Sequence, residues 1–273
     1  MIFKSISPSP ALQEFVRNYT LLQLKFKPGE PVPFKYRPPK PEQGIVFYIK
    51  GCVNLQNTVT GSQQLPSTVS VFTHQTERKI FQVSPEFFMF TVFLRPGILH
   101  RLTGVPSMEL NQDYHDAELF FGSEVREVTE QLCSATAFSS MVNIVEHFLL
   151  LKFSQAKSSS RVDDIANCLL ADPTGFSLDE IAKQACLSTK QFYRRFVERI
   201  GLSPKLFSRM TRFNLAYHYK IAHPGTTWSS VAQEFCYTDY HHLEKECKEF
   251  TGLTPNDWVK QSQASPERVL QLR

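Results

Sequence analysis

A basic and aromatic stretch in the C-terminal half, Thr189–Ile200, holds the side chains best suited to binding chemistry. It reads TKQFYRRFVERI, with Phe192 and Phe196 four residues apart. A helix with this spacing buries both phenylalanines on one face and turns the other face outward. The outward set comprises Lys190, Gln191, Tyr193 and Arg194. Because arginine can bind guanine through two hydrogen bonds and glutamine can pair with adenine, such a helix is suited to reading bases in the DNA major groove.

The four residues after this stretch occur twice. Gly201–Pro204 reads GLSP and Gly252–Pro255 reads GLTP, at an offset of 51 residues. Further upstream, Ile181–Ala182 corresponds to Val231–Ala232 at an offset of 50, so the second copy has one extra residue in its turn. Each copy predicts a helix, a tight turn, a second helix and a glycine stop before a proline. Helix pairs of this size place their second helix in the major groove.

The second copy offers a more acidic set of candidate base-reading residues, namely Tyr240, His241, Glu244 and Lys245. The basic residues placed for phosphates, or alternatively for structural ion pairs, are Arg195, Arg199, Lys205, Arg209 and Arg212, with Lys248 a further phosphate candidate. Residues 176–222 carry nine Lys or Arg against three Asp or Glu, a net charge of +6, whereas residues 223–260 carry three against six, a net charge of −3. Because phosphate neutralisation supplies much of the affinity for DNA, we expect the first copy to carry most of the binding.

Residues 177–216 and 227–258 resemble the paired helix–turn–helix domain of AraC-type transcriptional regulators, and the similarity covers roughly residues 162–260. The resemblance implies two recognition helices joined by a bridging helix over about 204–221, which present themselves to successive major-groove turns on one face of the DNA. It places Lys190, Tyr193 and Arg194 on the base-reading positions of the family. Two positions depart from the family pattern: Cys236 stands where a turn glycine is usual, and Cys247 where an aromatic residue is usual.

The N-terminal half carries most of the strand signals. Stretches rich in Val, Ile, Phe and Tyr predict strands over 43–53, 67–74, 79–83 and 87–94. Their spacing favours a small antiparallel sandwich or barrel, with Phe87, Phe88, Phe90 and Phe93 filling its core on alternating faces. The proline-rich segment 27–44 is expected to run as an extended surface loop. This half resembles, more loosely, the cupin-related sensor domains of AraC-type regulators, and residues 90–104 resemble a strand–Pro–Gly–helix passage of one sub-group.

Apolar periodicity predicts two helices over 123–132 and 139–153 that pack together or line a dimer interface. We expect a multidomain α+β protein: a β-rich, cupin-like sensor or dimerisation domain with these helices (1–155), a polar linker (156–161), the AraC-type DNA-binding domain (162–262) and a tail (263–273). The helices predicted after the linker span 162–170, 177–185, 189–200, 204–221, 228–235, 240–250 and 255–261. A capping box is predicted from Ser177 and Glu180.

Composition and motifs exclude several classes of protein. The chain has 273 residues, of which 42% are hydrophobic and 21% charged, as in ordinary globular proteins. Its longest apolar run, 87–94, is too short for a bilayer, and the N-terminus lacks the apolar core of a signal peptide. The six cysteines form no CxxC pair, so we expect reduced thiols, a cytoplasmic protein and no membrane partner.

Metal and catalytic sites are also disfavoured. Cys236, His241, His242 and Cys247 are zinc ligand types at spacings that do not match a closed structural site. His74, His100 and His115 are far apart in the sequence, and no nucleotide-binding glycine loop, nucleophile elbow or metalloprotease motif occurs. We therefore predict no metal, no cofactor and no enzyme activity.

The leading hypothesis is a sequence-specific transcription regulator of the AraC type that binds double-stranded DNA and acts as an activator. Its N-terminal domain would sense a small-molecule effector or mediate homodimerisation, and RNA polymerase is the expected further partner. One alternative is a cupin-type enzyme fused to a DNA-binding module. The other is a regulator controlled by a protein partner without a ligand.

Overall fold

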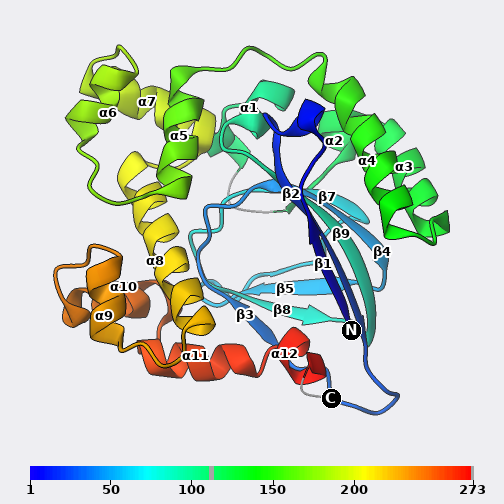
Figure 1. Cartoon of the computed structure of the whole chain (residues 1–273). Helices are drawn as coiled ribbons and strands as arrows, with labels where there is room; N and C mark the ends of the chain where they lie inside the picture. The colour runs from blue at the N-terminus through cyan, green and yellow to red at the C-terminus, as the bar shows by residue number, and fades with distance from the viewer. Residues whose placement is uncertain (111–113, 272–273) are drawn as a thin grey trace.

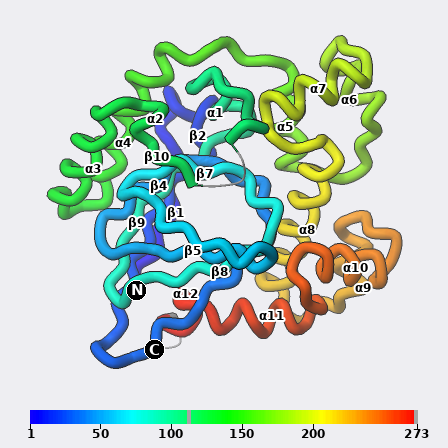
Figure 2. Tube along the Cα trace, turned by 180° about the vertical axis from the view of Figure 1, so that it is seen from behind, coloured from blue at the N-terminus to red at the C-terminus, as the bar shows by residue number. Residues whose placement is uncertain are grey.

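The computed structural model describes residues 1–110 and 114–271. Its N-terminal part is built from two antiparallel sheets that face each other (Figures 1 and 2). The larger sheet has the order β1 (Ile2–Ile6), β2 (Val16–Lys25), β9 (Glu86–Leu94), β4 (Gly44–Lys50), β7 (Val69–Phe72) and β10 (Tyr114–Asp116). The smaller sheet has the order β3 (Lys35–Arg37), β8 (Lys79–Val83), β5 (Val53–Asn57) and β6 (Gln63–Gln64). The predicted β-rich N-terminal domain is confirmed.

Strand β9 shows how the larger sheet serves two cores. Successive side chains on a strand point to opposite faces. Phe87 and Phe93 therefore face the smaller sheet, together with Met89 and Thr91. Phe88 and Phe90 face the opposite side and pack into the core beneath the helices. The prediction that the four phenylalanines fill the core on alternating faces is confirmed.

Helices cover the outer face of the larger sheet (Figure 1). They are α1 (Ile98–Thr103), α2 (Glu118–Phe121), α3 (Glu124–Ser134) and α4 (Phe138–Phe153), with two short 3-10 turns, η1 (Pro10–Leu12) and η2 (Ser107–Leu110). Helices α3 and α4 pack on each other and bury Val125, Leu132, Val145 and Leu149 against the sheet. Leu150 and Leu151 on α4 remain exposed.

Several N-terminal features differ from the sequence prediction, and the short elements β1, β6, β10 and α2 were not predicted. The expected strand 43–53 is two strands, because the chain turns at Gly51, whose φ of +77° is a conformation that L side chains rarely adopt. Strand β2 was not predicted, since it is buried on both faces and lacks a clean polar–apolar alternation. The proline-rich segment 27–44 is not only loop. It contains β3, which pairs with β8 at the sheet edge, where prolines before and after a strand are tolerated.

The C-terminal part is helical throughout its described residues. Its helices are α5 (Arg161–Ala171), α6 (Leu178–Gln184), α7 (Thr189–Ile200), α8 (Pro204–Ala222), α9 (Trp228–Glu234), α10 (Tyr240–Thr251), α11 (Pro255–Gln263) and α12 (Pro266–Gln271). The long α8 joins the two helix pairs α6–α7 and α9–α10 (Figure 1). All seven predicted helices are present within two residues of their expected ends, whereas α12 was not predicted.

Helix α12 lies against the β-domain rather than with the helix pairs. It sits beneath the sheets, close to the N-terminus, in both views (Figures 1 and 2), and Leu270 packs against the core between the two sheets. The segment 263–273, expected as a tail, therefore contains a helix that links the two parts of the molecule. Among the residues that the structure describes, no helix combines the length and apolar character needed to cross a bilayer.

Candidate functional site

The first helix–turn–helix unit consists of α6, a tight turn and α7. Ala182 of α6 is buried in the same core cluster as Phe192 and Phe196 of α7, and its carbonyl accepts a hydrogen bond from the Leu187 amide at 3.0 Å. Cys186 adopts a φ of 54° in the turn, a left-handed conformation in which glycine is the usual residue. The small alanine lets the helices approach closely, which sets the direction in which α7 leaves the turn.

The second unit repeats this turn. The Tyr237 amide donates to the Ala232 carbonyl at 2.9 Å, and Cys236 has a φ of 53°. Helices α6 and α9 each have 7 residues and start at an offset of 50, whereas α7 and α10 each have 12 residues and start at an offset of 51. The extra residue lies in the turn, as predicted. Replacing the usual glycine by Cys236 therefore leaves the turn geometry intact.

Helix α7 presents a basic and aromatic face. Phe192, Phe196 and Ile200 are fully buried. The exposed residues near the start of the helix are Lys190, Gln191, Tyr193, Arg194 and Arg195, and Glu198 is exposed nearer its end. Ser188 caps the helix by accepting from the Gln191 amide at 3.3 Å, and the Gln191 side-chain oxygen accepts from the Ser188 amide at 3.2 Å. The side chain of Gln191 thus completes a capping box, so contact with adenine would require it to leave that position.

Helix α10 has the same burial pattern and a different surface. Leu243 and Cys247 are buried at the positions that correspond to Phe192 and Phe196. The Glu244 carboxylate forms an ion pair with Lys248, with 3.0 Å between Oε1 and Nζ, and its other oxygen lies 3.9 Å from Nδ1 of His241. His241 and Lys245 are exposed, whereas Tyr240 and Glu244 are partly buried. The candidates of the second copy therefore share one surface with a carboxylate at its centre.

Glu246 of α10 is one of the six acidic residues counted in 223–260, but its side chain lies inside the protein. Only 2% of the residue is exposed. Its carboxylate accepts from Arg209 at 2.8 Å, from Arg212 at 3.0 Å and from the Tyr237 hydroxyl at 2.6 Å. Both arginines come from the bridging helix α8. Glu246 therefore holds the second unit onto the bridge instead of facing DNA.

Four of the six phosphate candidates form ion pairs: Lys248 pairs with Glu244, as described above, and three arginines have carboxylate partners of their own. Arg209 and Arg212 pair with Glu246, and Arg209 also reaches Glu249 at 2.6 Å. Arg199 pairs with the buried Asp163 of α5 through two hydrogen bonds of 2.7 and 2.6 Å. For these arginines the structure favours the second sequence-based alternative, a structural pair. Arg195 and Lys205 are exposed.

These pairs change the interpretation of the charge counts. Arg209 and Arg212 belong to the +6 segment, and Glu246 and Glu249 belong to the −3 segment. Because the four groups neutralise one another across the α8–α10 contact, removing two positive charges from the first count leaves +4. Removing two negative charges from the second leaves −1. The first copy is still the more basic one, by a smaller margin.

The N-terminal domain contacts the C-terminal end of each recognition helix. At the end of α7, the Ser107 hydroxyl donates to the Arg199 carbonyl at 2.7 Å. At the end of α10, the Arg78 guanidinium donates to the Thr251 carbonyl. The buried His74 packs against Phe207 of α8 with ring centroids 5.9 Å apart, and burial lowers its pKa to about 4. No sequence motif indicated these contacts, because they join residues far apart in the chain.

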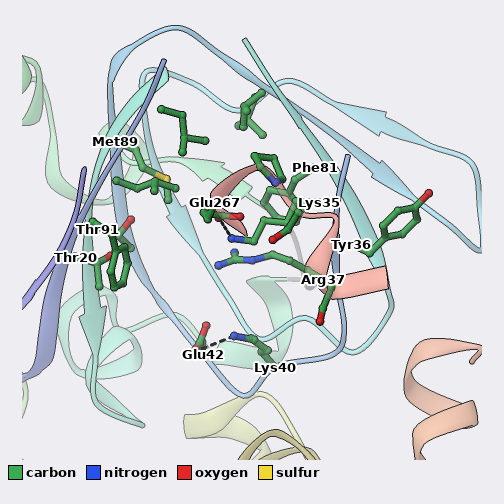
Figure 3. A pocket seen from close by; sticks show the side chains of 18 of the residues that line it. Thr20, Lys35, Tyr36, Arg37, Lys40, Glu42, Phe81, Met89, Thr91 and Glu267 are labelled. Carbon is green, nitrogen blue, oxygen red and sulfur yellow. Dashed lines mark hydrogen bonds and ion pairs between the residues drawn. The ribbon is translucent and has the colours of Figure 1, made fainter. Parts of the chain in front are cut away.

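A cavity of about 520 Å³ lies between the two sheets and extends to α11 and α12. We refer to it as the central cavity. Its aromatic lining includes Tyr48, Phe72, Phe81, Phe87, Phe93 and Tyr114 from the two sheets, and Tyr217 and Trp258 from the C-terminal helices. Lys35 and Arg37 point into it from β3, whereas Tyr36 between them points away (Figure 3). From the sequence we expected the phenylalanines to fill this space as a core, and we did not predict strand β3.

Two close ion pairs join charged residues that line the central cavity. Lys35 contacts Glu267 of α12, and Lys40 lies 3.9 Å from Glu42 (Figure 3). Burial alone would raise the pKa of Glu42, but Lys40, Arg17 and Arg37 outweigh burial and lower it to about 2. Burial lowers the pKa of Lys35, and the carboxylate of Glu267 opposes that shift. Within the described part of the chain, no three His, Cys, Asp or Glu side chains gather closely enough to hold a metal ion.

Comparison with known proteins gives matches for both parts of the chain. Residues 181–261 match the model of a family described as a helix-turn-helix domain, and residues 4–116 match one described as a domain of unknown function. No curated protein matches the sequence.

Solved structures extend the comparison to the whole chain. A crystal structure of a ToxT variant from Vibrio cholerae without ligand has 12% identity, covers 89% of this chain and 97% of its own, and gives a TM-score of 0.50. Wild-type ToxT from the same organism with an unsaturated fatty acid bound has 11% identity, covers 89% of this chain and 94% of its own, and gives 0.49. The AraC-like transcriptional activator CuxR has 8% identity, covers 99% of this chain and 81% of its own, and gives a TM-score of 0.24. The first of these shows a shared fold.

Proposed function

We propose that this chain is a DNA-binding transcription regulator whose C-terminal part is an AraC-type helix-turn-helix domain. It reads its operator mainly through α7, and a small molecule bound in the central cavity controls its activity. The coarse function rests on the helix-turn-helix match and the shared fold. Which residues read bases and what controls the regulator belong to the proposal, and each part has its own support.

The observation that carries the DNA-reading proposal is the exposed face of α7. Two units with the same turn are held by one bridging helix, and the first exposes Lys190, Tyr193, Arg194 and Arg195 over a fully buried aromatic face. We assign base reading to Lys190, Tyr193 and Arg194, and phosphate contacts to Arg195 and Lys205. In the second unit, Lys245 and His241 are the exposed candidates, while Glu244 competes with phosphate for the nearby cations.

The central cavity supports control by a small molecule over control by a protein partner alone. Its volume of about 520 Å³ lies in the ordinary range of ligand sites, which are apolar hollows with a few convergent polar groups. Aromatic side chains line it, and Lys35 and Arg37 supply convergent charge (Figure 3). Residues of α8, α11 and α12 also border it, so an occupant would contact the C-terminal part directly.

Homodimerisation and activation complete the proposal. Helices α3 and α4 form an outer pair, and Leu150 and Leu151 of α4 are exposed apolar side chains suited to a subunit contact. The AraC resemblance favours activation through contact with RNA polymerase. A promoter-fusion reporter that responds positively to the protein supports activation, whereas a negative response makes it a repressor.

The decisive experiment is genome-wide mapping of the sites bound by the native protein, followed by affinity measurements on the recovered operator. Arg194→Ala should weaken binding and relax base preference at one position. Arg195→Ala and Lys205→Ala should weaken binding to all DNA sequences by the same factor. Each should also reduce the slope of log K against the logarithm of the salt concentration by about one. Discrete sites that share no sequence pattern would contradict base reading by α7.

The alternative of a cupin-type enzyme fused to a DNA-binding module predicts a different outcome. It requires turnover of a small molecule by the protein, whereas the proposed regulator binds its effector and releases it unchanged. Recovery of the bound molecule after incubation, analysed by mass spectrometry, separates the two functions.

A further inference from the structure

Helix α12 closes the central cavity from the C-terminal side. It follows the end of α11 by two residues, and its Glu267 side chain enters the cavity toward Lys35 and Arg37 (Figure 3). Leu270, one turn further along, packs against the core between the sheets. A short helix with one carboxylate and one apolar side chain therefore fills part of the space that a ligand would take.

We propose that Glu267 occupies the anion position of the central cavity, and that an effector with an anionic group and an apolar body binds by taking its place. The proposal rests on the proposed role of this cavity as the effector site, and it adds the chemical class of the effector and an internal competitor. The C-terminal helix is then an intramolecular ligand, released when the effector arrives.

The charges around the cavity explain why an anion is required there. Lys35 is partly buried and forms an ion pair with the carboxylate of Glu267. The Arg37 guanidinium lies over the Phe81 ring, 4.8 Å from its centroid. A cation that loses its carboxylate in such surroundings is strongly disfavoured. An occupant without negative charge would leave Lys35 in that state when it displaced Glu267, whereas an anion would restore the pair.

Glu267 is also held in a way that allows exchange. One carboxylate oxygen contacts Lys35, whereas the other is buried and has no hydrogen-bond partner among the described residues. An internal ligand that leaves one oxygen unsatisfied is bound less well than an anion that can satisfy all its acceptors. The aromatic side chains that line the cavity would then contact the apolar body of the effector.

The position of α12 gives the exchange a route to the DNA-binding domain. Helix α11, which precedes it directly, buries Trp258 in the core of the helix-turn-helix domain, and the same side chain borders the central cavity. Displacement of Glu267 therefore frees the segment that follows the second recognition helix, α10.

The test uses two fluorescent probes that differ by one charge: anilinonaphthalene sulfonate, which is anionic, and N-phenylnaphthylamine, which lacks the sulfonate. Both are titrated into the full chain and its variants. Glu267→Gln, which removes the charge and keeps the shape, should strengthen sulfonate binding by about tenfold and leave the neutral probe unchanged. Adding Lys35→Met to that variant should abolish the gain.

The wild-type protein provides a second measurement that no folding defect can obscure. Hydrogen exchange of the α12 amides should speed up severalfold when the sulfonate probe is added, and should not respond to the neutral probe at equal occupancy. Removal of residues 266–273 should strengthen binding of both probes, because the helix and Leu270 leave the cavity together.

The outcomes separate this inference from the proposed function. If both probes bind and Glu267→Gln changes neither affinity, or changes both alike, the internal-ligand proposal is wrong and the effector cavity stands. If α12 exchange is unaffected by the sulfonate at saturation, the proposal is wrong as well. If neither probe binds to any variant, the cavity is not a ligand site and both ideas fail.

Discussion

The two helix–turn–helix units share a backbone and differ in what their side chains do. Their turns carry matching hydrogen bonds and a cysteine in the left-handed conformation. Position 195 of the first unit corresponds to position 246 of the second, yet Arg195 is exposed and Glu246 is buried in an ion-pair cluster. The two units therefore share one backbone geometry, while the second uses a position on its second helix for attachment to the bridging helix α8.

The largest expected effect breaks this attachment. Glu246→Ala would leave Arg209 and Arg212 without their shared buried carboxylate, and should lower the free energy of unfolding by about 3–5 kcal/mol. The measurement is denaturant unfolding followed by circular dichroism. Arg195→Ala, at the matched position of the first unit, should cost less than about 0.5 kcal/mol because its side chain is exposed.

A second control lies within the same cluster. Glu249 also pairs with Arg209, but its side chain is 51% exposed, and exposed pairs contribute about 0–1 kcal/mol. Glu249→Ala should therefore resemble Arg195→Ala. A loss as large as that of Glu246→Ala would mean that the surface pair, and not the buried carboxylate, holds α10 to the bridge.

The buried His74, which packs against Phe207 of α8, should make stability depend on pH. The pKa of His74 falls from its ordinary 6.5 to about 4 because burial disfavours the charged ring. Between these values the unfolded chain binds a proton that the folded chain does not, so stability declines as pH falls from 6.5 to 4. The decline amounts to about 3 kcal/mol at most.

Unfolding titrations across that pH range check the prediction with His74→Phe, which keeps a ring against Phe207 and cannot titrate. The variant should lack this part of the decline. Glu42 serves as an internal reference, because its pKa of about 2 gives stability that is lost below the ordinary carboxylate pKa in both proteins. Identical profiles for wild type and variant would remove His74 as the cause.

Much of the C-terminal domain followed from sequence because its determinants are local. The spacing of Phe192 and Phe196 and the glycine stops concern residues within a few turns of one another, and the offset of the two copies follows from comparing two such local patterns. Each of these predictions is confirmed. The expected capping box at Ser177 is wrong. Its side chain makes no cap hydrogen bond, whereas Ser160 and Ser188 do.

What the sequence could not reveal depends on tertiary contacts. Whether Glu246 faces DNA or Arg212 is decided by how α10 rotates against α8, and helical periodicity alone leaves that rotation open. The same holds for the central cavity, which is formed by β3, by β9 and by a C-terminal helix more than two hundred residues away from β3. Neither β3 nor α12 has a strong local signal, so their meeting at Lys35 and Glu267 could not be anticipated.

The comparison of the two reading faces predicts unequal losses of DNA affinity. Arg194→Ala should weaken binding to the operator by about tenfold or more, as expected for a lost bidentate base contact. Lys245→Ala, at the matched position, should cost less than about threefold, because the adjacent Glu244 carboxylate lowers the net positive charge of that surface. Fluorescence anisotropy with the recovered operator measures both. Equal losses would contradict the asymmetry and show that the second unit reads bases.

The smallest expected effect tests the shared turn. Cys186 and Cys236 have φ values of 54° and 53°, which cost an L residue about 1 kcal/mol more than glycine. Cys236→Gly should therefore raise the free energy of unfolding by up to about 1 kcal/mol. Cys186→Gly should gain less, because the Cys186 sulfur accepts a contact from Arg161 at 2.6 Å that glycine would lose.

A third cysteine-to-glycine substitution, which should lower stability instead of raising it, serves as the control for this small effect. Cys168 lies in α5 and is also exposed, but its backbone is helical, so Cys168→Gly should destabilise the protein by about 0.5–1 kcal/mol. Thermal unfolding of the three variants side by side distinguishes relief of backbone conformation from loss of a thiol. If all three substitutions lower stability, the cysteines contribute contacts in the turns that outweigh their conformation, and the two units keep cysteine there because of those contacts.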